Sequence, residues 1–187
     1  MNQLDLIQKF RSILPMVRKW IENTLEKHNA NATPVISLSF SRLKTVLPLD
    51  LLNRAKVVVV NGVVPFPPLS RMGLPELSRM ENMPMAGVTY KDTFFVSNLH
   101  QTESLHFHEI VHVVQWERLG IEKFLLAYGY GLMRFGYQDS PLEKMAYSLQ
   151  ARFDNGMLSG DIVQFIQHET DAVWNRVSES ISMPGKV

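Results

Sequence analysis

The chain of 187 residues contains no cysteine. This absence excludes a disulfide framework, catalysis by a thiol, and zinc held by cysteine. No apolar run approaches the roughly 20 residues that a membrane-spanning helix needs. The N-terminus also lacks the charged leader and clean apolar stretch of a secretory signal. We therefore expect a cytoplasmic protein with no membrane partner.

An excess of charge of either sign is also missing. The formal net charge is +1, and the lysine and arginine residues are dispersed along the chain. Nucleic acids and anionic membranes bind clustered basic residues, so neither is an expected partner. A hydrophobic content of 45% and a charged content of 20% are ordinary for a globular protein. We predict a single domain over residues 1–187, which is long enough to fold without a disulfide or a structural metal.

The first third of the chain predicts a helix followed by strands. Hydrophobic residues recur at helical spacing over residues 2–28 and predict an N-terminal helical segment within residues 1–30. Pro15 should bend or break this helix. Residues 34–40, PVISLSF, predict a short strand, and the valine-rich residues 56–60 predict a buried one.

The rest of the chain completes an α+β pattern. Residues 41–55 predict short helical turns, and the proline- and methionine-rich residues 64–85 predict a long irregular segment. Residues 86–97 predict two short strands. From Thr102 onward the spacing is helical and ends in a C-terminal helix over residues 160–182. The sequence therefore predicts an N-terminal helix, a small mixed sheet and a helical C-terminal half.

Residues 105–116, LHFHEIVHVVQW, place three of the six histidines in an otherwise apolar run. His108, Glu109 and His112 form the pattern H-E-x-x-H. On a helix the two histidines lie about 40° apart around the axis, so both imidazoles can reach one ion. Glu109 lies about 100° from His108, where its carboxylate can touch a water on that ion without binding the ion itself.

These residue types at this spacing fit the chemistry of zinc hydrolysis. Two neutral imidazoles hold the ion, an open position holds water, and a carboxylate accepts the water's proton. Zinc lowers the pKa of that water to about 7. The alternative, histidines satisfied by hydrogen bonds in the core, has to explain several buried polar groups in one apolar helix, each costly without a partner. We therefore predict a Zn²⁺ site with His108 and His112 as ligands and Glu109 as the base.

A third ligand is needed, and Glu143 is the best candidate. It follows a Ser-Pro helix start, so it falls in the first turn of a second helix that can lie against the histidines. A glutamate in that turn could equally be favoured by the helix dipole. His168, Glu169 and Asp171, on a later helix, are rivals. His106 is expected to precede the metal helix, or to lie on its wrong face.

Several neighbouring residues are candidates for supporting roles. Gln115, three residues after His112, could orient a histidine, meet the substrate or satisfy an internal carbonyl group. Tyr137 and Tyr147 flank the third ligand, so either could stabilise an oxyanion or simply pack. Trp116 is expected in the core.

The motif and the Val-Val-Gln-Trp that follows it, with Glu143, Ala146 and Tyr147 downstream, resemble the zincin superfamily of metallopeptidases. The similarity is closest to a loosely characterised bacterial group with HExVHVVQW and a downstream GY…ExxAY, and it covers roughly residues 55–152. Tyr147 stands where glutamate zincins place an aspartate, four residues after the ligand. The contacts around this ligand are therefore expected to differ.

The resemblance implies a zincin-like fold in which His108, His112 and Glu143 bind zinc and Glu109 acts as the base. It also implies that an edge strand within residues 86–97 pairs with an extended peptide substrate. The chain lacks the third histidine and the glycine turn that follow the motif in metzincins, which argues against that subgroup.

Two functions are consistent with these features. The first is a zinc-dependent hydrolase, a metallopeptidase that cleaves peptide bonds through a zinc-bound water activated by Glu109. The alternative is a non-catalytic, zinc-stabilised module that binds a peptide or protein. Glu109 favours the enzyme, because a structural site needs no acid at that position. A fourth protein ligand would favour the binding module.

Overall fold

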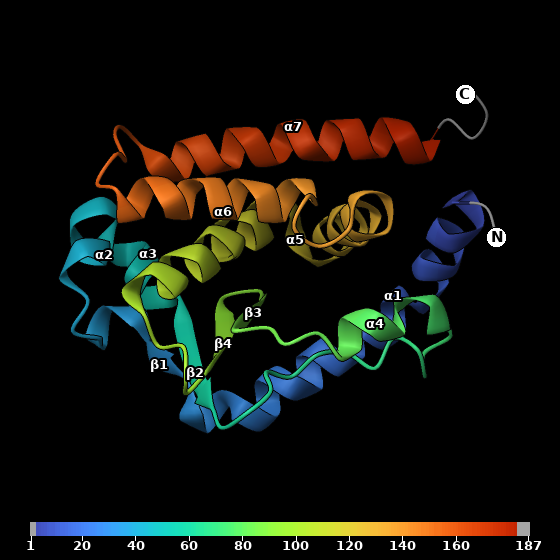
Figure 1. Cartoon of the computed structure of the whole chain (residues 1–187), viewed down its shortest axis with the longest axis horizontal. Coiled ribbons are helices and arrows are strands. Elements are labelled where there is room, and N and C mark those ends of the chain that lie inside the picture. The colour runs from blue at the N-terminus through green and yellow to red at the C-terminus, as the bar shows by residue number, and fades with distance from the viewer. Residues whose placement is uncertain (1–2, 183–187) are drawn as a thin grey trace.

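The computed structural model describes residues 3–182, and residues 1–2 and 183–187 lie outside the described part of the chain. As predicted, the fold is α+β, with seven α-helices and one small mixed sheet among the described residues (Figure 1). The α-helices are α1 Gln3–His28, α2 Ser41–Val46, α3 Leu49–Arg54, α4 Ser78–Glu81, α5 Glu103–Phe135, α6 Pro141–Asp154 and α7 Ile162–Ser182. The strands are β1 Thr33–Pro34, β2 Lys56–Val60, β3 Gly87–Tyr90 and β4 Thr93–Ser97. Short 3-10 turns occupy Asn29–Asn31, Val35–Ser37 and Pro75–Leu77.

The four strands are ordered β1-β2-β4-β3. β2 and β4 are parallel, and the two outer pairs are antiparallel. The two strands predicted within residues 86–97 are present, and a tight turn joins them, where Lys91 has a φ of 58°. β3 is therefore an edge strand that pairs only with β4 within the described sheet.

Successive residues of β4 point to opposite faces of the sheet. Helices cover both of these faces. Phe94 and Val96 join one hydrophobic cluster with the apolar residues of α2, α3 and the first half of α5. Phe95 joins a second cluster with Val17 and Ile21 of α1. Figure 1 shows the result: α1 runs along one side of the sheet, with α5, α6 and α7 on the other.

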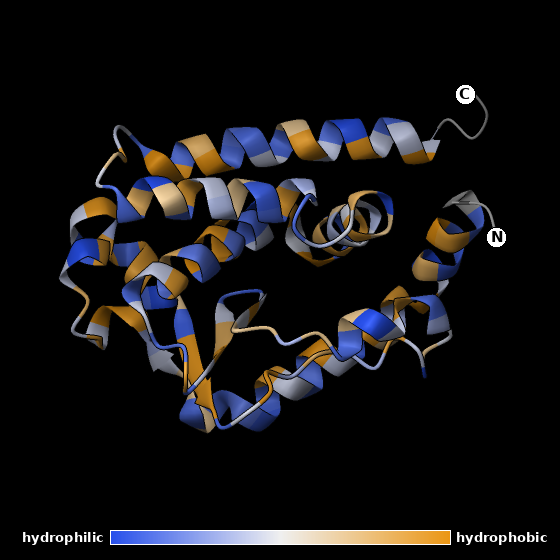
Figure 2. Cartoon of the chain, viewed as in Figure 1, coloured by the Kyte–Doolittle hydropathy of each residue, from blue (hydrophilic) through white to orange (hydrophobic). Residues whose placement is uncertain are grey.

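The N-terminal helix buries the face that its hydrophobic spacing predicts. Ile7, Phe10, Val17 and Ile21 are all buried. Apolar and polar residues alternate along α1 and α7 (Figure 2), as expected for helices with one buried face. Pro15 lies inside α1 and does not end it.

A kink divides α5 into two segments. Gly120 has φ 69° and ψ 172°, which is not helical. A positive φ is readily adopted only by glycine. Figure 1 shows the segment after the kink nearly end-on, so the chain turns sharply there. Gly129 of this segment lies against the ring of Phe10 in α1. This turn brings the end of α5 back over the start of α6.

Two local predictions are wrong. Residues 34–40 do not form a strand, because only Pro34 pairs with the sheet and the 3-10 turn Val35–Ser37 follows at once. The hydroxyl of Ser37 donates to the carbonyl of Pro34 at 2.7 Å, and Val35 packs in the core. Such local hydrogen bonds compete with strand pairing. His106 does not precede the helix of the H-E-x-x-H motif, because α5 begins at Glu103.

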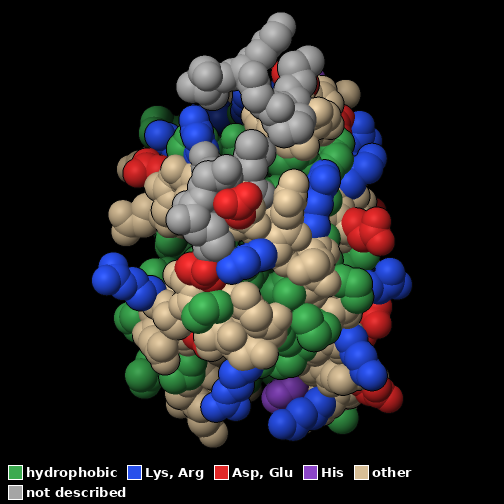
Figure 3. All heavy atoms as spheres, turned by 90° about the vertical axis from the view of Figure 1, so that its right-hand side faces the viewer, with side chains coloured by type: hydrophobic (Ala, Val, Ile, Leu, Met, Phe, Trp, Pro, Cys, Tyr) green, Lys and Arg blue, Asp and Glu red, His purple; other side chains and the backbone are tan. Residues whose placement is uncertain are grey.

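The segment of residues 64–85 is irregular, as predicted, apart from the short turn Pro75–Leu77 and α4. None of the helices within residues 3–182 is both long and apolar enough to cross a membrane. On the face shown in Figure 3, acidic and basic side chains are interspersed among hydrophobic ones.

Candidate metal centre

The H-E-x-x-H motif lies in the first segment of α5. Thr102 caps this helix, since its hydroxyl accepts the N–H of Leu105 at 3.1 Å. His108, Glu109 and His112 are 3%, 3% and 5% exposed. The apolar residues between and after them fix the helix against the sheet, so the polar groups of the motif are held away from bulk solvent.

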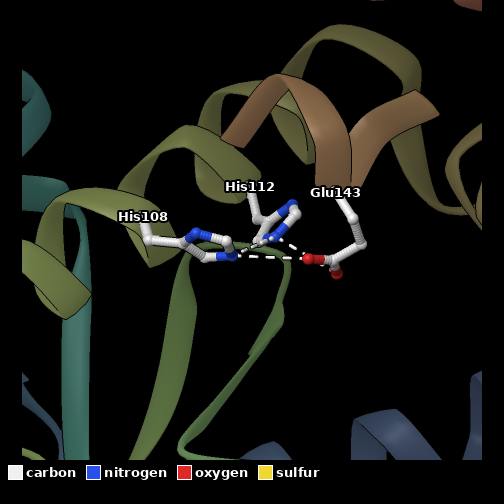
Figure 4. A group of neighbouring side chains, drawn as sticks. All are labelled: His108, His112 and Glu143. Carbon is white, nitrogen blue, oxygen red and sulfur yellow. Dashed lines mark hydrogen bonds and ion pairs between the residues drawn. The ribbon is translucent and has the colours of Figure 1, made fainter. Parts of the chain in front are cut away.

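Glu143, from the first turn of α6, points at the two histidines (Figure 4). The Nε2 atoms of His108 and His112 are 3.2 Å apart, and each lies 3.4 Å from an oxygen of Glu143. A tetrahedral ion with zinc-like bond lengths separates its ligand atoms by about 3.3–3.5 Å. The triangle of ligand atoms therefore fits, and these three buried residues could hold a metal ion.

The charges at this centre also suit a cation. Burial alone would raise the pKa of Glu143, but the neighbouring His112 and His108 outweigh it and bring the pKa well below its usual range. Burial would lower the pKa of His112, but the charge and hydrogen bonding of Glu143 raise it to about 9. Oε2 of Glu143 is buried and has no hydrogen-bond partner among the described residues. Such an atom is costly unless a cation occupies its lone pairs.

Two glutamines orient the histidines. Oε1 of Gln115 accepts from Nδ1 of His112 at 2.8 Å, while its amide nitrogen donates to the carbonyl of Leu142 at 3.1 Å. Oε1 of Gln150 lies 3.0 Å from Nδ1 of His108. Because an amide oxygen can only accept, each Nδ1 donates a proton to its glutamine, and Nε2 is the nitrogen that could bind a metal once it carries no proton. Gln115 therefore fills two of its three predicted roles: it orients His112 and it satisfies the carbonyl group of Leu142.

Glu109 lies beside this triangle and is held by β3. The hydroxyl of Thr89 donates to Oε2 of Glu109 at 2.6 Å. Gly87 packs so closely on the carboxylate that a Cβ at this position would overlap it. The indole N–H of Trp116 donates to the carbonyl of Thr89 at 3.1 Å and so fixes the strand to α5. Burial is the main cause that raises the pKa of Glu109.

Three tyrosines surround Glu143. Tyr128, from the second segment of α5, donates to Oε1 of Glu143 at 2.6 Å. Tyr137 and Tyr147 are hydrogen-bonded to each other, and the ring centroid of Tyr147 lies 4.6 Å from that of His108. Burial raises the pKa of both Tyr137 and Tyr147, so their hydroxyl groups stay protonated at neutral pH. Each can therefore act as a hydrogen-bond donor beside the metal centre.

The rival ligands lie apart from this group. His106 is turned to the other side of α5, where its Nδ1 lies 2.8 Å from the carbonyl of Thr102. The side chain of His168 is 80% exposed and lies beside Glu169. Asp171 pairs with Arg118 at the surface. Each of these side chains is engaged elsewhere.

The sequence interpretation missed four contributors: Gly87, Thr89, Tyr128 and Gln150. Tyr128 lies in a strongly apolar helical stretch, which predicts packing in the core. On a straight helix its Cα would lie about 24 Å along the axis from that of His112, yet the two rings are 6.4 Å apart. The signal that could have revealed this is Gly120, a residue type that commonly ends helices. Gly87 and Thr89 alternate along a predicted strand, so a shared face was foreseeable, but its neighbour was not.

No protein-family model matches the chain, and neither the curated proteins nor the solved structures give a match.

Proposed function

We propose that this protein is a zinc-dependent hydrolase of the zincin type, a metallopeptidase. One observation carries the proposal: three buried side chains that could hold a metal ion lie beside a fourth buried side chain, the acid Glu109, which is tied to β3. The group of possible ligands within the described residues has three members. Three protein ligands leave a position for water and substrate, whereas a structural zinc site is closed by four.

His108, His112 and Glu143 would hold the ion. A bound zinc ion would act as a Lewis acid, which polarises a carbonyl group and lowers the pKa of water. Glu109 accepts the proton of the attacking water and then delivers it to the leaving amine. Its raised pKa suits this work, because a base is most effective when its pKa approaches the working pH.

The hydroxyl groups near the metal centre supply hydrogen bonds to the developing oxyanion. Tyr147 is 42% exposed and packs on the ring of His108, so it can meet a substrate at the edge of the centre. Tyr137 is hydrogen-bonded to Tyr147 and lines the cavity at the centre. Tyr128 is bound to Glu143 instead, so it orients the ligand.

A peptide substrate is supported by the position of β3. One cavity is lined by the four residues of β3 together with Glu109, His112 and Glu143. An extended peptide in this cavity can hydrogen-bond to the free edge of β3 while its scissile bond lies near Glu109. Main-chain pairing of this kind recognises a peptide with little demand on its sequence.

The proposal is tested by measuring metal content and cleavage together. Wild-type protein should contain about one zinc per chain and should cleave some members of a panel of peptides and unfolded proteins. His112→Ala should lose both metal and cleavage. Arg118→Ala, which removes only a surface ion pair with Asp171, is the matched control and should keep both. Wild-type protein that takes up no zinc would refute the metal centre.

A further inference from the structure

A row of hydrogen bonds runs from His108 to the surface of the protein, where the first segment of α5 packs against α6. Nδ1 of His108 lies 3.0 Å from Oε1 of Gln150. The amide nitrogen of Gln150 donates to the hydroxyl of Ser104 at 2.9 Å, and this hydroxyl donates to Oδ2 of Asp154 at 2.9 Å. His108 is buried, whereas Asp154 is exposed. The row therefore joins a candidate metal ligand to a carboxylate at the surface.

The direction of every bond in this row follows from its outer end. A carboxylate can only accept a hydrogen bond, so Ser104 gives its single hydroxyl proton to Asp154. The hydroxyl must then accept from Gln150, which turns the amide nitrogen of Gln150 toward Ser104. The amide oxygen is left facing His108, so Nδ1 of this ring donates, while Nε2 is the nitrogen that lies beside Glu143.

The other candidate histidine ligand is held in a different way. The amide nitrogen of Gln115 donates to the main-chain carbonyl of Leu142 at 3.1 Å, so the amide oxygen has to face Nδ1 of His112. A main-chain carbonyl is an acceptor whatever side chain the residue carries. For His108 the same role falls to a hydroxyl and a carboxylate, which are side-chain groups that a substitution can remove.

Without its outer end, the row has no fixed direction. The amide group of a glutamine can turn by 180° and exchange the positions of its oxygen and its nitrogen. If Ser104 is free to donate inward, the oxygen of Gln150 can accept its proton, and the amide nitrogen then faces His108. Two N–H groups would meet there, unless the imidazole ring turns and withdraws Nε2 from the metal centre. Either change opposes metal binding.

We propose that Ser104 and Asp154 are positioning residues of the metal centre, which act on His108 through the direction in which they turn the amide of Gln150. This inference rests on the proposed function, because it requires His108 to be a metal ligand. The two histidines are then unequal. His112 is oriented by the main chain, and His108 is oriented by two side chains from the start of α5 and the end of α6.

The first test measures zinc affinity by competition with a chelator. Asp154→Ala should weaken zinc binding about threefold to tenfold, which is less than the roughly 10–100-fold expected for direct loss of the contact in Gln150→Leu. Asp154→Lys should weaken it further, because an ammonium group can only donate and so reverses the row. Asp139→Lys makes the same change of charge at an exposed residue that pairs with Lys144, outside the row. This matched control should leave zinc affinity nearly unchanged.

Nitrogen-15 NMR of the zinc-loaded protein separates a change of direction from a general loosening of the fold. In the wild type both histidines should carry a proton on Nδ1. In Asp154→Lys the Nδ1 proton of His108 should exchange faster with water or disappear. The Nδ1 proton of His112, which Gln115 holds, should stay as in the wild type. Equal changes at both histidines would mean that α5 and α6 have moved apart, and would overturn the proposal.

A second variant, Gln150→Glu, removes the need for the outer residues, because a carboxylate accepts from His108 and from Ser104 whichever way it is turned. In the Gln150→Glu background, Asp154→Ala should therefore no longer weaken zinc binding. A merely structural effect of Asp154 would persist, so an equal loss of affinity in both backgrounds overturns the proposal. This comparison stands even if Asp154→Lys fails to fold.

Failure of this inference is distinct from failure of the metal centre. Zinc affinity equal to that of the wild type in both Asp154→Ala and Asp154→Lys would overturn the positioning role and leave the metal centre intact. Wild-type protein that binds no zinc would refute the metal centre, and the positioning role with it.

Discussion

Zinc affinity should depend steeply on pH near neutrality, because His112 has to lose a proton before its Nε2 can bind the ion. Glu143 raises the pKa of His112 to about 9. At that pKa about 99% of metal-free molecules carry the proton at pH 7 and about 91% at pH 8. The deprotonated fraction therefore rises about ninefold between these pH values, and the affinity for zinc should rise by the same factor. At pH 7 nearly one proton should leave His112 for each zinc bound.

Two measurements check this prediction. Competition with a chromogenic chelator of known pH dependence gives the zinc Kd at several values between pH 6.5 and 8. Calorimetry at pH 7 in two buffers of different ionisation enthalpy gives the number of protons released. Zinc affinity that is flat between pH 7 and 8, with no proton released, would refute the coupling between His112 and Glu143.

Glu143→Gln is the matched control, because it keeps the shape and the hydrogen bond from Tyr128 but removes the charge. Without that charge the pKa of His112 should fall, because burial lowers it and only Glu109 and the hydrogen bond with Gln115 would still raise it. The steep rise above pH 7 should then disappear, and zinc should bind more weakly at every pH.

Three further outcomes are expected. Glu143→Ala should weaken zinc binding by more than the roughly 10–100-fold that is usual for loss of a supporting contact. Asp171→Ala should leave zinc binding unchanged. The reverse result would make Asp171 the third ligand in place of Glu143. Thr89→Val, which removes the hydrogen bond to Glu109, should lower the cleavage rate by about tenfold or more at unchanged zinc content, and Thr89→Ser should restore it. Gly87→Ala should lower the free energy of unfolding by about 1–3 kcal/mol, because the added Cβ overlaps the carboxylate of Glu109. In thermal melts, the double variant Gly87→Ala with Glu109→Ala should recover part of this loss.

The sequence predicted the elements that local patterns determine. The valines of β2, the strands on either side of Lys91 and the three C-terminal helices all follow from hydrophobic spacing and turn chemistry. The same local patterns predicted that Glu143 lies in the first turn of α6. In the structure this residue lies beside His108 and His112.

The contacts that depend on tertiary packing could not be predicted. Gln150 and His108 come from different helices, and their hydrogen bond depends on how α6 crosses α5. The close approach of Gly87 to Glu109 depends on the distance between β3 and α5. The strand predicted at residues 34–40 is absent, because the hydroxyl of Ser37 and the buried Val35 stabilise a turn after Pro34. Spacing along the chain gives the face of an element, but not the partner that this face meets.

The proposed hydrolysis requires Glu109 to act as a base and not as a metal ligand. The most direct test compares zinc-loaded wild-type protein with Glu109→Gln on the same peptide panel, with the metal content of both measured. The amide has the same shape and can still accept the hydrogen bond from Thr89, so zinc content and melting temperature should be nearly unchanged. Because an amide cannot accept the proton of the attacking water, cleavage should fall by about 10²–10⁴-fold. Equal cleavage by both proteins would refute the role of Glu109 as the base. Peptide binding without cleavage by the wild type would refute the hydrolase, because it is the behaviour of a binding module.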